Sequence, residues 1–388
     1  MKKVAILGST GSIGKQTIDV IRKNKKKFKI LLLTANKNHN LLSKQIKEFN
    51  VKNVIVSDQK SYSILKKKFK NIKIYNDLNK IDKIIPSKFD YTMSAISGFY
   101  GLKPTIKIIK KTKTIAIANK ESIICGWNLI KRQLKKYNTK FIPVDSEHFS
   151  IWSVIKNINS NLIDQIIITA SGGPFLNKSV NQLKKANVRN VINHPNWSMG
   201  KKISTDSASM MNKVFEVIEA SKIFELDIKR IKIIVHPKSI IHAVVVFKNG
   251  LIKVLIHDTS MEIPIFNILF NNRNINFYNR TDINFQRLNG INFIEPDKRK
   301  FPYINILKKK ITTNTYFEII LVTINDELVK LFLKKKISFV QMQNLLIKSI
   351  NSNIFKKFYQ KYPKNINDIH IMADKVKKYL YENEKIFK

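Results

Sequence analysis

Asp145 and Glu147 form an acidic pair whose spacing suits metal binding. They lie in the segment Pro143-Val-Asp-Ser-Glu-His148, directly after an apolar run that we expect to be a strand. Side chains two positions apart on an extended chain leave it on the same side, so the two carboxylates would repel each other. A divalent cation such as Mg²⁺ or Mn²⁺, which prefers oxygen ligands, would neutralise them. A solvated turn with Asp145 as the N-cap of the next helix explains the same residues equally well.

A second polar cluster occurs where we expect one helix, over residues 206–224. Four polar side chains would share one face of that helix: Ser209, Asn212, Lys213 and Glu216. Hydroxyl, amide and ammonium groups suit a phosphate monoester, while Glu216 could complete a metal site with the acidic pair. The alternative is a surface helix with a Lys213–Glu216 ion pair worth about 0.2–0.5 kcal/mol.

Two shorter motifs could contact a substrate or a cofactor. Ala118-Asn-Lys-Glu-Ser122 follows an expected strand, with a solvated turn as the alternative. His194-Pro-Asn-Trp-Ser-Met-Gly200 lies in a polar stretch that could close over a substrate and exclude water. His236 and His242 lie on expected strands, where a lone histidine is usually structural, although His242 could face the site.

The segment Gly8-Ser-Thr-Gly-Ser-Ile-Gly14 has the pattern of a phosphate-binding turn. It follows the apolar run Val4-Ala-Ile-Leu7, and an amphipathic helix pattern begins directly after it. Glycines let the backbone approach a pyrophosphate, and the helix N-terminus directs unpaired N–H groups at it. The spacing differs from the commoner G-x-G-x-x-G, and a purely structural turn is the alternative. The strand and the helix on either side favour a nucleotide site.

The end of the second expected strand indicates which nucleotide would bind. In NAD-binding folds an acidic residue at this place holds the ribose hydroxyl. Here the strand is followed by Ala35-Asn36-Lys37-Asn38, which contains no carboxylate. One lysine and two amides suit a ribose phosphate, so we predict NADP(H) rather than NAD(H). An ordinary solvated loop is the alternative.

The composition is that of a basic globular protein. The chain has 388 residues, of which 44% are hydrophobic, enough for two or three domains. The net charge of +44 comes from lysines spread along the whole chain, whereas a nucleic-acid site would cluster them. We therefore expect no nucleic-acid binding, although the charge could attract anionic substrates.

The same features predict a cytoplasmic location. No apolar stretch reaches the roughly 18 residues of a membrane span, so we expect no membrane association. The first strand is expected to begin at Val4, which leaves no room for a signal or transit peptide. Cys125 is the single cysteine, which excludes internal disulfides and fits a reducing compartment.

Apolar runs alternate with helical patterns through residues 1–146, which predicts a Rossmann-like parallel sheet with right-handed crossovers. The expected strands are Val4–Leu7, Lys29–Thr34, Asn53–Ser57, Tyr91–Ala95, Thr114–Ala118 and Phe141–Val144. We interpret residues 1–146 as an NADPH-binding domain of the α/β class.

After residue 146 the pattern becomes that of an α+β domain. Further strands are expected at Ile166–Thr169, Ile231–His236, Ile240–Lys248 and Leu251–His257, the last two joined by an Asn249-Gly250 hairpin turn. We assign residues 147–271 to a central α+β catalytic and dimerisation domain with a lid loop at about 172–202. Residues 272–300 then form a linker, and residues 301–388 form a C-terminal helical bundle.

In order and spacing, these motifs resemble the 1-deoxy-D-xylulose-5-phosphate reductoisomerases. The resemblance also includes Ser171-Gly-Gly-Pro-Phe175, Asp206-Ser-Ala-Ser-Met-Met-Asn-Lys213 and His236-Pro-Lys-Ser-Ile-Ile-His242. It covers residues 1 to about 270, while the C-terminal part is similar mainly in length and helical character. It implies a homodimeric oxidoreductase that uses NADPH and a divalent cation, Mg²⁺, Mn²⁺ or Co²⁺.

The resemblance also implies a reaction. The cation would chelate the carbonyl and the neighbouring hydroxyl of the sugar phosphate 1-deoxy-D-xylulose 5-phosphate. The carbon skeleton would rearrange by retro-aldol cleavage and re-addition, and NADPH would reduce the branched aldehyde to 2-C-methyl-D-erythritol 4-phosphate. This is the committed step of the non-mevalonate pathway to isoprenoids.

Carried over position by position, the resemblance implies a role for each motif residue. The metal ligands would be Asp145, Glu147 and Glu216. The substrate contacts would be Lys120, Ser146, Glu147, Ser171, His194, Trp197, Ser207, Asn212, Lys213 and Glu216, with Lys120, Glu147 and His194 as catalytic residues. The NADPH contacts would be Thr10, Gly11, Ser12, Ile13, Asn36, Lys37, Asn38, Asn119, Glu121 and Gly200.

Several positions depart from the family pattern, among them Val214-Phe215, which replaces a usual small-large pair beside the metal helix. Asn36 stands where the family usually has glycine, and asparagine is the next best residue if the backbone needs a positive φ. We therefore expect function to be kept, with weaker NADPH binding. Ser209 replaces a usual threonine and keeps the hydroxyl.

Overall fold

The structure is a computed structural model that describes residues 1–81, 84, 88–270, 276–277, 286, 288–308 and 311–382. Contacts within the chain divide it into two compact units. The first unit comprises Met1–Ile123, Asn128–Phe149 and Ser260–Asp282. The second unit comprises Ile124–Trp127, Ser150–Thr259 and Ile283–Lys388.

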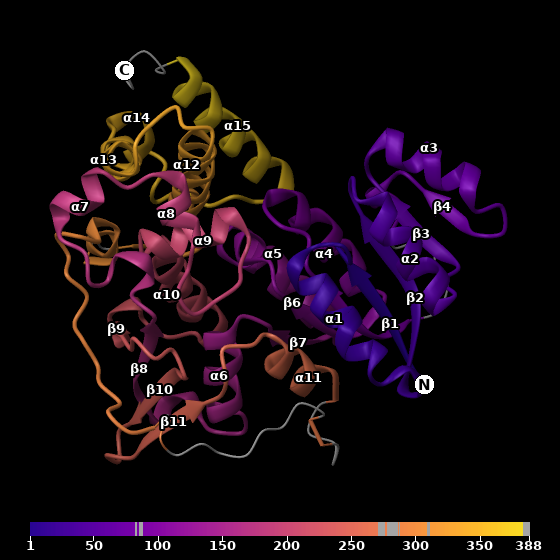
Figure 1. Cartoon of the computed structure of the whole chain (residues 1–388), viewed down its shortest axis with the longest axis horizontal. Helices are drawn as coiled ribbons and strands as arrows, with labels where there is room; N and C mark the ends of the chain where they lie inside the picture. Colours follow the sequence, from indigo (N-terminus) through magenta and orange to yellow (C-terminus); the bar gives the residue numbers. More distant parts are fainter. Residues whose placement is uncertain are drawn as a thin grey trace. The chain divides into compact units, whose positions relative to one another are not determined.

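The first unit is built on a seven-stranded sheet with the order β4-β3-β2-β1-β5-β6-β7 (Figure 1). Its strands are β1 (Lys2–Leu7), β2 (Phe28–Ala35), β3 (Asn53–Val56), β4 (Lys73–Tyr75), β5 (Phe89–Ser94), β6 (Thr112–Ile117) and β7 (Lys140–Pro143). Neighbouring strands pair in parallel, which confirms the predicted α/β class. Sequence reasoning missed β4, because three residues are too short to show a period.

Helices connect these strands and cover the sheet. They are α1 (Ser12–Arg22), α2 (His39–Phe49), α3 (Gln59–Lys68), α4 (Leu102–Ile109), α5 (Lys120–Tyr137) and α11 (Glu262–Phe270). The central strand β1 is fully buried from Val4 to Leu7, as expected for a parallel sheet covered on both faces. Far along the sequence, α11 packs on α1, and Phe270 meets Phe28 at the start of β2 with ring centroids 5.3 Å apart.

The second unit contains a four-stranded sheet with the order β11-β10-β8-β9. Its strands are β8 (Ile163–Ala170), β9 (Ile231–Val235), β10 (Ile241–Phe247) and β11 (Ile252–Ile256). β8 and β9 are parallel, whereas β10 is antiparallel to both β8 and β11. Gly250 takes a φ of +86° in the turn between β10 and β11, so the predicted Asn249-Gly250 hairpin is confirmed.

The expected single helix over 206–224 is wrong. Two helices occupy this segment, α9 (Lys201–Ala208) and α10 (Met211–Phe224), and Met210 between them has a left-handed backbone with a φ of 62°. The Ser209 hydroxyl donates to the Asp206 carbonyl at 3.2 Å and accepts from the Met211 N–H at 3.4 Å. Serine hydroxyls compete with helical backbone bonds in this way. Because Met210 is buried, packing stabilises a conformation that non-glycine residues rarely adopt.

The polar stretch expected to be a lid loop contains short helices. They are α7 (Val180–Lys184) and α8 (Val188–Ile192), each started by a reciprocal capping box. Ser179 and Gln182 form the first box, and Asn187 and Asn190 form the second. Helices of five residues show too little periodicity to be read from sequence.

The C-terminal part of the second unit is helical, as predicted. After a 3₁₀ segment, Pro302–Lys308, come α12 (Tyr316–Leu333), α13 (Phe339–Ile350), α14 (Asn353–Lys356) and α15 (Ile366–Glu382). The expected linker, residues 272–300, lies partly outside the described residues, and residues 383–388 also lie outside them. Within the described ranges, no helix combines the length and the apolar character needed to cross a bilayer.

Candidate active site

The glycine turn after β1 is held by two neighbouring elements. The N–H groups of Gly8 and Ser9 donate to the Thr34 carbonyl at 3.1 and 2.9 Å. The Ser9 hydroxyl donates to Gln45 Oε1 at 2.7 Å, and the Gln45 amide donates to the Ser9 carbonyl at 3.0 Å. A Cβ on Gly14 would lie 2.1 Å from the Gly8 carbonyl oxygen, so only glycine lets α1 start this close to the turn. Sequence reasoning missed Gln45, whose only signal is a polar residue on the apolar face of α2.

The start of α1 is open to a ligand. Gly11 is its N-cap, no side chain caps the helix, and no acidic residue lies in the first turn. Thr10 and Ile13 are half-buried, whereas Gly11 and Ser12 are exposed. The first N–H groups of a helix have no carbonyl partner within it, and its positive end attracts anions. The four residues to which the resemblance assigns NADPH contacts in the glycine turn therefore lie at a helix N-terminus that suits a pyrophosphate.

The loop after β2 is exposed at Asn36, Lys37 and Asn38. Asn38 is the N-cap of α2, and its Oδ1 accepts from the Leu41 N–H at 3.1 Å. Asn36 is not among the residues with a left-handed backbone. The departure from glycine at this position therefore causes no backbone strain.

The motif after β6 forms the start of α5. Asn119 is buried, and its Oδ1 accepts from the Ser122 N–H at 2.6 Å. Its amide donates to the carbonyls of Ile96 and Gly98, the latter at 2.9 Å. The Asn119 side chain thus fixes the loop after β5 beside the start of α5. Glu121, in the first turn of α5, is half-buried.

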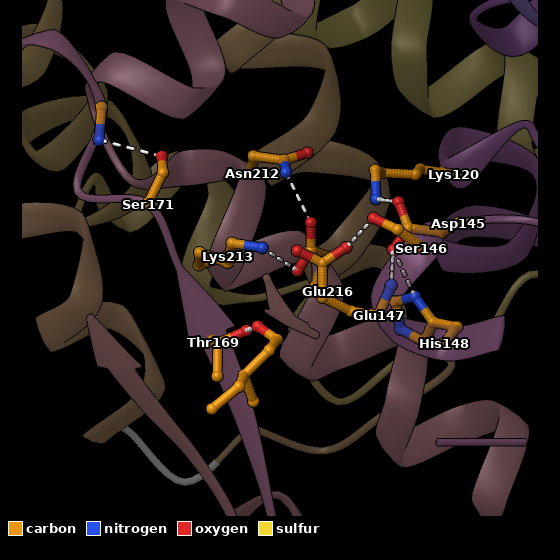
Figure 2. A network of polar contacts seen from close by, with 12 residues as sticks. Lys120, Asp145, Ser146, Glu147, His148, Thr169, Ser171, Asn212, Lys213 and Glu216 are labelled. Atoms are coloured by element: carbon orange, nitrogen blue, oxygen red, sulfur yellow. Dashed lines mark hydrogen bonds and ion pairs between the residues drawn. The ribbon is translucent and has the colours of Figure 1, made fainter. Parts of the chain in front are cut away.

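Asp145 is the centre of a polar cluster in the first unit. One carboxylate oxygen pairs with the Lys120 ammonium group, and the other lies 3.0 Å from His148 Nδ1 (Figure 2). The Ser146 hydroxyl donates to the carboxylate of the largely buried Glu147. Lys120 follows β6 and Asp145 follows β7, so these two side chains meet because the two parallel strands are neighbours. His148 is fully buried; sequence reasoning assigned it no role, although it lies one helical turn from Asp145.

The reason given for the proximity of Asp145 and Glu147 is wrong. β7 ends at Pro143, and α6 (Ser146–Ile155) begins directly after Asp145. Asp145 therefore takes the N-cap place, where its Oδ1 accepts from the Glu147 N–H at 3.3 Å. The start of a helix, and not strand alternation, positions the two carboxylates.

Glu216 is the acidic centre of the second unit. Its carboxylate accepts from the Lys213 ammonium group at 2.7 Å and from the Asn212 amide (Figure 2). The Lys213 and Glu216 side chains are 9% and 1% exposed, so the alternative of a solvated surface ion pair is wrong. Ser209 lies in the turn before α10 and does not share the face of these residues, because the helix breaks at Met210.

Ser171 and His194 meet just beyond the end of β8. The His194 Nε2 atom lies 2.9 Å from the Ser171 hydroxyl, which also accepts from the Gly173 N–H at 3.0 Å. A Cβ on Gly173 would lie 3.3 Å from the Ser207 carbonyl oxygen, so the Ser171 loop passes close to Ser207. Burial and the charge of Lys213 lower the pKa of His194 to about 4. A neutral imidazole thus lies beside Ser171, a serine predicted to bind substrate.

The segment 194–200 contacts the turn between β9 and β10. The Asn196 amide donates to the Pro237 carbonyl at 2.9 Å and to the Ser239 hydroxyl at 2.7 Å. The Trp197 ring packs edge-on against His242, with ring centroids 6.0 Å apart. Gly200 is exposed, caps α9, and has no heavy atom within 4 Å of an added Cβ. Sequence reasoning missed Asn196, which lies inside a motif that it singled out.

His242 is stacked on a second histidine. Its ring lies 3.7 Å from that of His257, and its Nε2 is 3.1 Å from the His257 carbonyl oxygen. His242 therefore contacts Trp197, a residue to which the resemblance assigns a substrate contact.

A parallel nucleotide-binding sheet, acidic clusters and a serine–lysine–asparagine group together define a class: dinucleotide-dependent enzymes that act on small anionic substrates. Three family models match the chain. The 1-deoxy-D-xylulose 5-phosphate reductoisomerase model matches residues 4–126, its C-terminal domain model residues 141–224, and the DXP reductoisomerase C-terminal domain model residues 257–379. The chain belongs to the 1-deoxy-D-xylulose 5-phosphate reductoisomerase family and is an oxidoreductase.

Curated relatives agree along the whole chain. The 1-deoxy-D-xylulose 5-phosphate reductoisomerase of Pelagibacter ubique is 54% identical over 380 residues, which cover 97% of this chain and 98% of the relative. The enzyme of the same name from Wolbachia pipientis subsp. Culex pipiens is 39% identical over 361 residues, 92% and 91% of the two chains.

Solved structures of the family share the fold. The Zymomonas mobilis reductoisomerase in complex with NADPH has a TM-score of 0.87 at 31% identity and covers 97% of each chain. A DOX-P reductoisomerase in complex with NADPH, fosmidomycin and magnesium has a TM-score of 0.92 at 30% identity, covering 100% of this chain and 99% of its own.

Proposed function

We propose that this chain converts 1-deoxy-D-xylulose 5-phosphate to 2-C-methyl-D-erythritol 4-phosphate, with NADPH and a divalent cation as cofactors. Membership of the reductoisomerase family supports the reaction, which supplies isoprenoid precursors in the non-mevalonate pathway. The observation that carries the proposal is the Asp145 cluster, which lies beyond the sheet edge where doubly wound α/β folds bind their ligands.

The first unit fits NADPH. The uncapped start of α1 suits the pyrophosphate, and the residues proposed to hold it are Thr10, Gly11, Ser12 and Ile13. The exposed Lys37, with Asn36 and Asn38, would contact the ribose phosphate. Asn119 and Glu121 of this unit and Gly200 of the second unit complete the proposed set of NADPH contacts.

The acidic residues fit a hard divalent cation such as Mg²⁺, Mn²⁺ or Co²⁺. Asp145, Glu147 and Glu216 each offer a carboxylate oxygen, and we propose that the three together hold one ion. In the structure, Lys120 and Lys213 neutralise two of these carboxylates. Buried carboxylates need a positive partner. If Lys120 and Lys213 bind substrate instead, a divalent cation would have to neutralise the carboxylates in their place.

The phosphate of the substrate would bind where hydroxyl, amide and ammonium donors meet. Ser171, Ser207, Asn212 and Lys213 are proposed to supply these donors in the second unit. Ser171 accepts from His194 and from the Gly173 N–H, so its own proton is available to an anionic oxygen. His194 would hold that serine in a donating orientation.

When bound, the cation polarises the carbonyl and the neighbouring hydroxyl of the substrate, and NADPH supplies the hydride. Lys120 and Lys213 then lose their carboxylate partners and can donate to substrate oxygens instead. Ser146 and Glu147 would contact the same part of the substrate. Trp197, held by His242, would cover the substrate and exclude water, with the segment 172–202 as a lid.

Two broader properties complete the proposal. The edge strand β11 exposes Ile252, Val254 and Ile256 by 61%, 45% and 44%, which supports a homodimer that buries this edge. The single, buried Cys125 supports a cytoplasmic location.

The test is turnover of 1-deoxy-D-xylulose 5-phosphate, followed as cation-dependent NADPH oxidation with the purified full chain. E147Q should lose most turnover and keep its affinity for NADPH, because Glu147 follows β7, three strands along the sheet from β1 and its glycine turn. A normal rate in this variant would refute the metal assignment. The control is 1-deoxy-D-xylulose without phosphate, which should be a poor substrate if the second unit binds phosphate.

A further inference from the structure

Lys222 is a fully buried cation that no step above uses. It lies on α10, and its ammonium group pairs with Glu318 Oε1 at 2.9 Å, the two side chains being 1% and 0% exposed. The same ammonium group donates to the Ile124 carbonyl. An ion pair this deep costs desolvation free energy, so a purely stabilising role would be better served by apolar side chains.

Glu318 is held rigidly on the other side of the pair. It is the N3 residue of the capping box that starts α12, and its oxygens accept from the N–H groups of Asn314 and Thr315 at 2.6 and 2.7 Å. The carboxylate therefore cannot move without uncapping α12. The Glu318 carboxylate, which caps the start of α12, therefore holds the Lys222 ammonium group in place.

Ile124 lies at a defect in α5. The helix has non-helical backbone angles at Gly126, where φ is −129° and ψ is 15°. Sharp kinks occur where a side chain inserts into the ladder of helical hydrogen bonds. The Lys222 ammonium group donates to the Ile124 carbonyl, whose usual helical partner, the N–H four residues on, lies beyond the non-helical Gly126. The kinked segment, Ile124–Trp127, groups with the second unit, whereas the rest of α5 belongs to the first.

We propose that Lys222 is a positioning residue that sets the direction of the first turn of α5, and with it the place of Lys120. Lys120 is the first residue of α5, one helical turn before Ile124. Without the ammonium group, the Ile124 carbonyl would be buried and unsatisfied, and α5 would gain by straightening to recover its own hydrogen bond. Straightening would carry Lys120 away from Asp145. The proposal rests on the proposed function, in which Lys120 contacts the substrate.

The decisive comparison uses two double variants of the full chain, K222Q/E318Q and K222M/E318Q. Both lose the ion pair without leaving a buried charge, but only glutamine keeps a donor for the Ile124 carbonyl. At saturating substrate and Mg²⁺, kcat of K222M/E318Q should fall about tenfold or more, since small displacements of a reacting group are costly. K222Q/E318Q should retain most of kcat. Equal rates in the two variants would overturn the proposal.

A matched control separates positioning from loss of stability. Ser221 is the next residue on α10, is buried, and donates to the Leu226 carbonyl at 2.6 Å, whereas Lys222 donates to α5. S221A should lower the thermal midpoint as K222M/E318Q does, yet change kcat by less than about twofold, because no catalytic group depends on it. A kcat loss in S221A equal to that in K222M/E318Q would show a merely structural role.

Amide hydrogen exchange of the NADPH-bound chain tests the kink without turnover. K222M/E318Q should change exchange rates in residues 120–128 more than in α13, and unchanged rates in 120–128 would refute the mechanism. If the wild-type chain fails to turn over 1-deoxy-D-xylulose 5-phosphate, the proposed function fails, while this exchange measurement still decides the role of Lys222.

Discussion

The Nε2 atom of His194 lies 2.9 Å from the hydroxyl oxygen of Ser171, and the other ring nitrogen of His194 accepts two backbone N–H groups. Those N–H groups belong to Asn196 and Trp197, at 3.1 and 3.0 Å. Nδ1 is therefore the acceptor, which places the proton on Nε2 and makes the imidazole a donor to Ser171. The ring links the segment 194–197 to a serine proposed to bind phosphate.

Removing this donor should weaken phosphate binding. H194F keeps the ring shape but leaves the Ser171 hydroxyl free to rotate, so KM for the sugar phosphate should rise about tenfold, as expected for a lost hydrogen bond to a charged group. In H194Q, which retains a donor, KM should rise less. The measurement is KM with phosphorylated substrate. In an S171A background, H194F should raise KM little further. An equally large rise in KM there would contradict the idea that His194 acts through Ser171.

The low pKa of His194 predicts how stability depends on pH. Burial lowers this pKa to about 4, from 6.5 in the unfolded chain, so the unfolded chain binds the extra proton between these values. The His194 contribution to stability is thus present above about pH 6.5 and is lost as the pH falls toward about 4. Urea unfolding across this range should give a shallower pH slope in H194F than in the wild type. Identical slopes would show that the residue titrates normally.

Gly14 and Gly11 should respond differently to alanine. In G14A the new Cβ would meet the Gly8 carbonyl oxygen at 2.1 Å, so the free energy of unfolding should fall by about 2–4 kcal/mol, in the range of severe steric mutations. In G11A the nearest atom is 3.4 Å away, so stability should hold while NADPH affinity falls, because the methyl group faces the exposed start of α1. Calorimetry and NADPH titration measure the two effects. Tight NADPH binding by G11A would place the pyrophosphate elsewhere.

Lys37 should set the preference for NADPH over NADH. K37A removes an exposed positive charge after β2, so KM for NADPH should rise about tenfold while KM for NADH stays the same, since only NADPH carries the ribose phosphate. N38A removes a neutral contact and the N-cap of α2, so it should cost about 1 kcal/mol of stability and affect the preference less than K37A does. Parallel changes of both KM values in K37A would mean that Lys37 does not contact the phosphate.

Removal of the divalent cation should inactivate the enzyme reversibly. A chelator should abolish turnover, and Mg²⁺, Mn²⁺ or Co²⁺ should restore it, because each accepts oxygen ligands. E216Q should need more cation for half-maximal activity than the wild type, by about tenfold, since it removes one charged ligand. An unchanged cation requirement in E216Q would exclude Glu216 from the metal site.

The alternation of apolar runs with helical patterns predicted the sheet of the first unit well, because parallel strands buried on both faces are continuous apolar runs. β4 was not predicted, since Lys73-Ile-Tyr75 is too short to show a pattern. The break at Met210 could not be predicted, because it depends on a left-handed methionine that only tertiary packing stabilises. For the same reason, the contacts of Gln45 and Lys222 with segments far along the chain have no local signal.

The site residues were accessible to sequence reasoning to different degrees. Motif chemistry identified Asp145 and Glu147, and the adjacency of parallel strands explains why Lys120 reaches Asp145. The helix start that arranges the two carboxylates was offered only as the alternative, with Asp145 as its N-cap, because a short α6 leaves little periodicity at its beginning.

The break at Met210 also has an electrostatic consequence. It starts a fresh helix directly before Asn212 and Lys213, and the N-cap residue offers no side-chain oxygen to the first turn. The macrodipole of α10 would therefore add to the potential that attracts a dianion to the proposed phosphate site. A bound phosphoryl group would act as the missing cap, so ligand capture and the ordering of α10 should be thermodynamically linked.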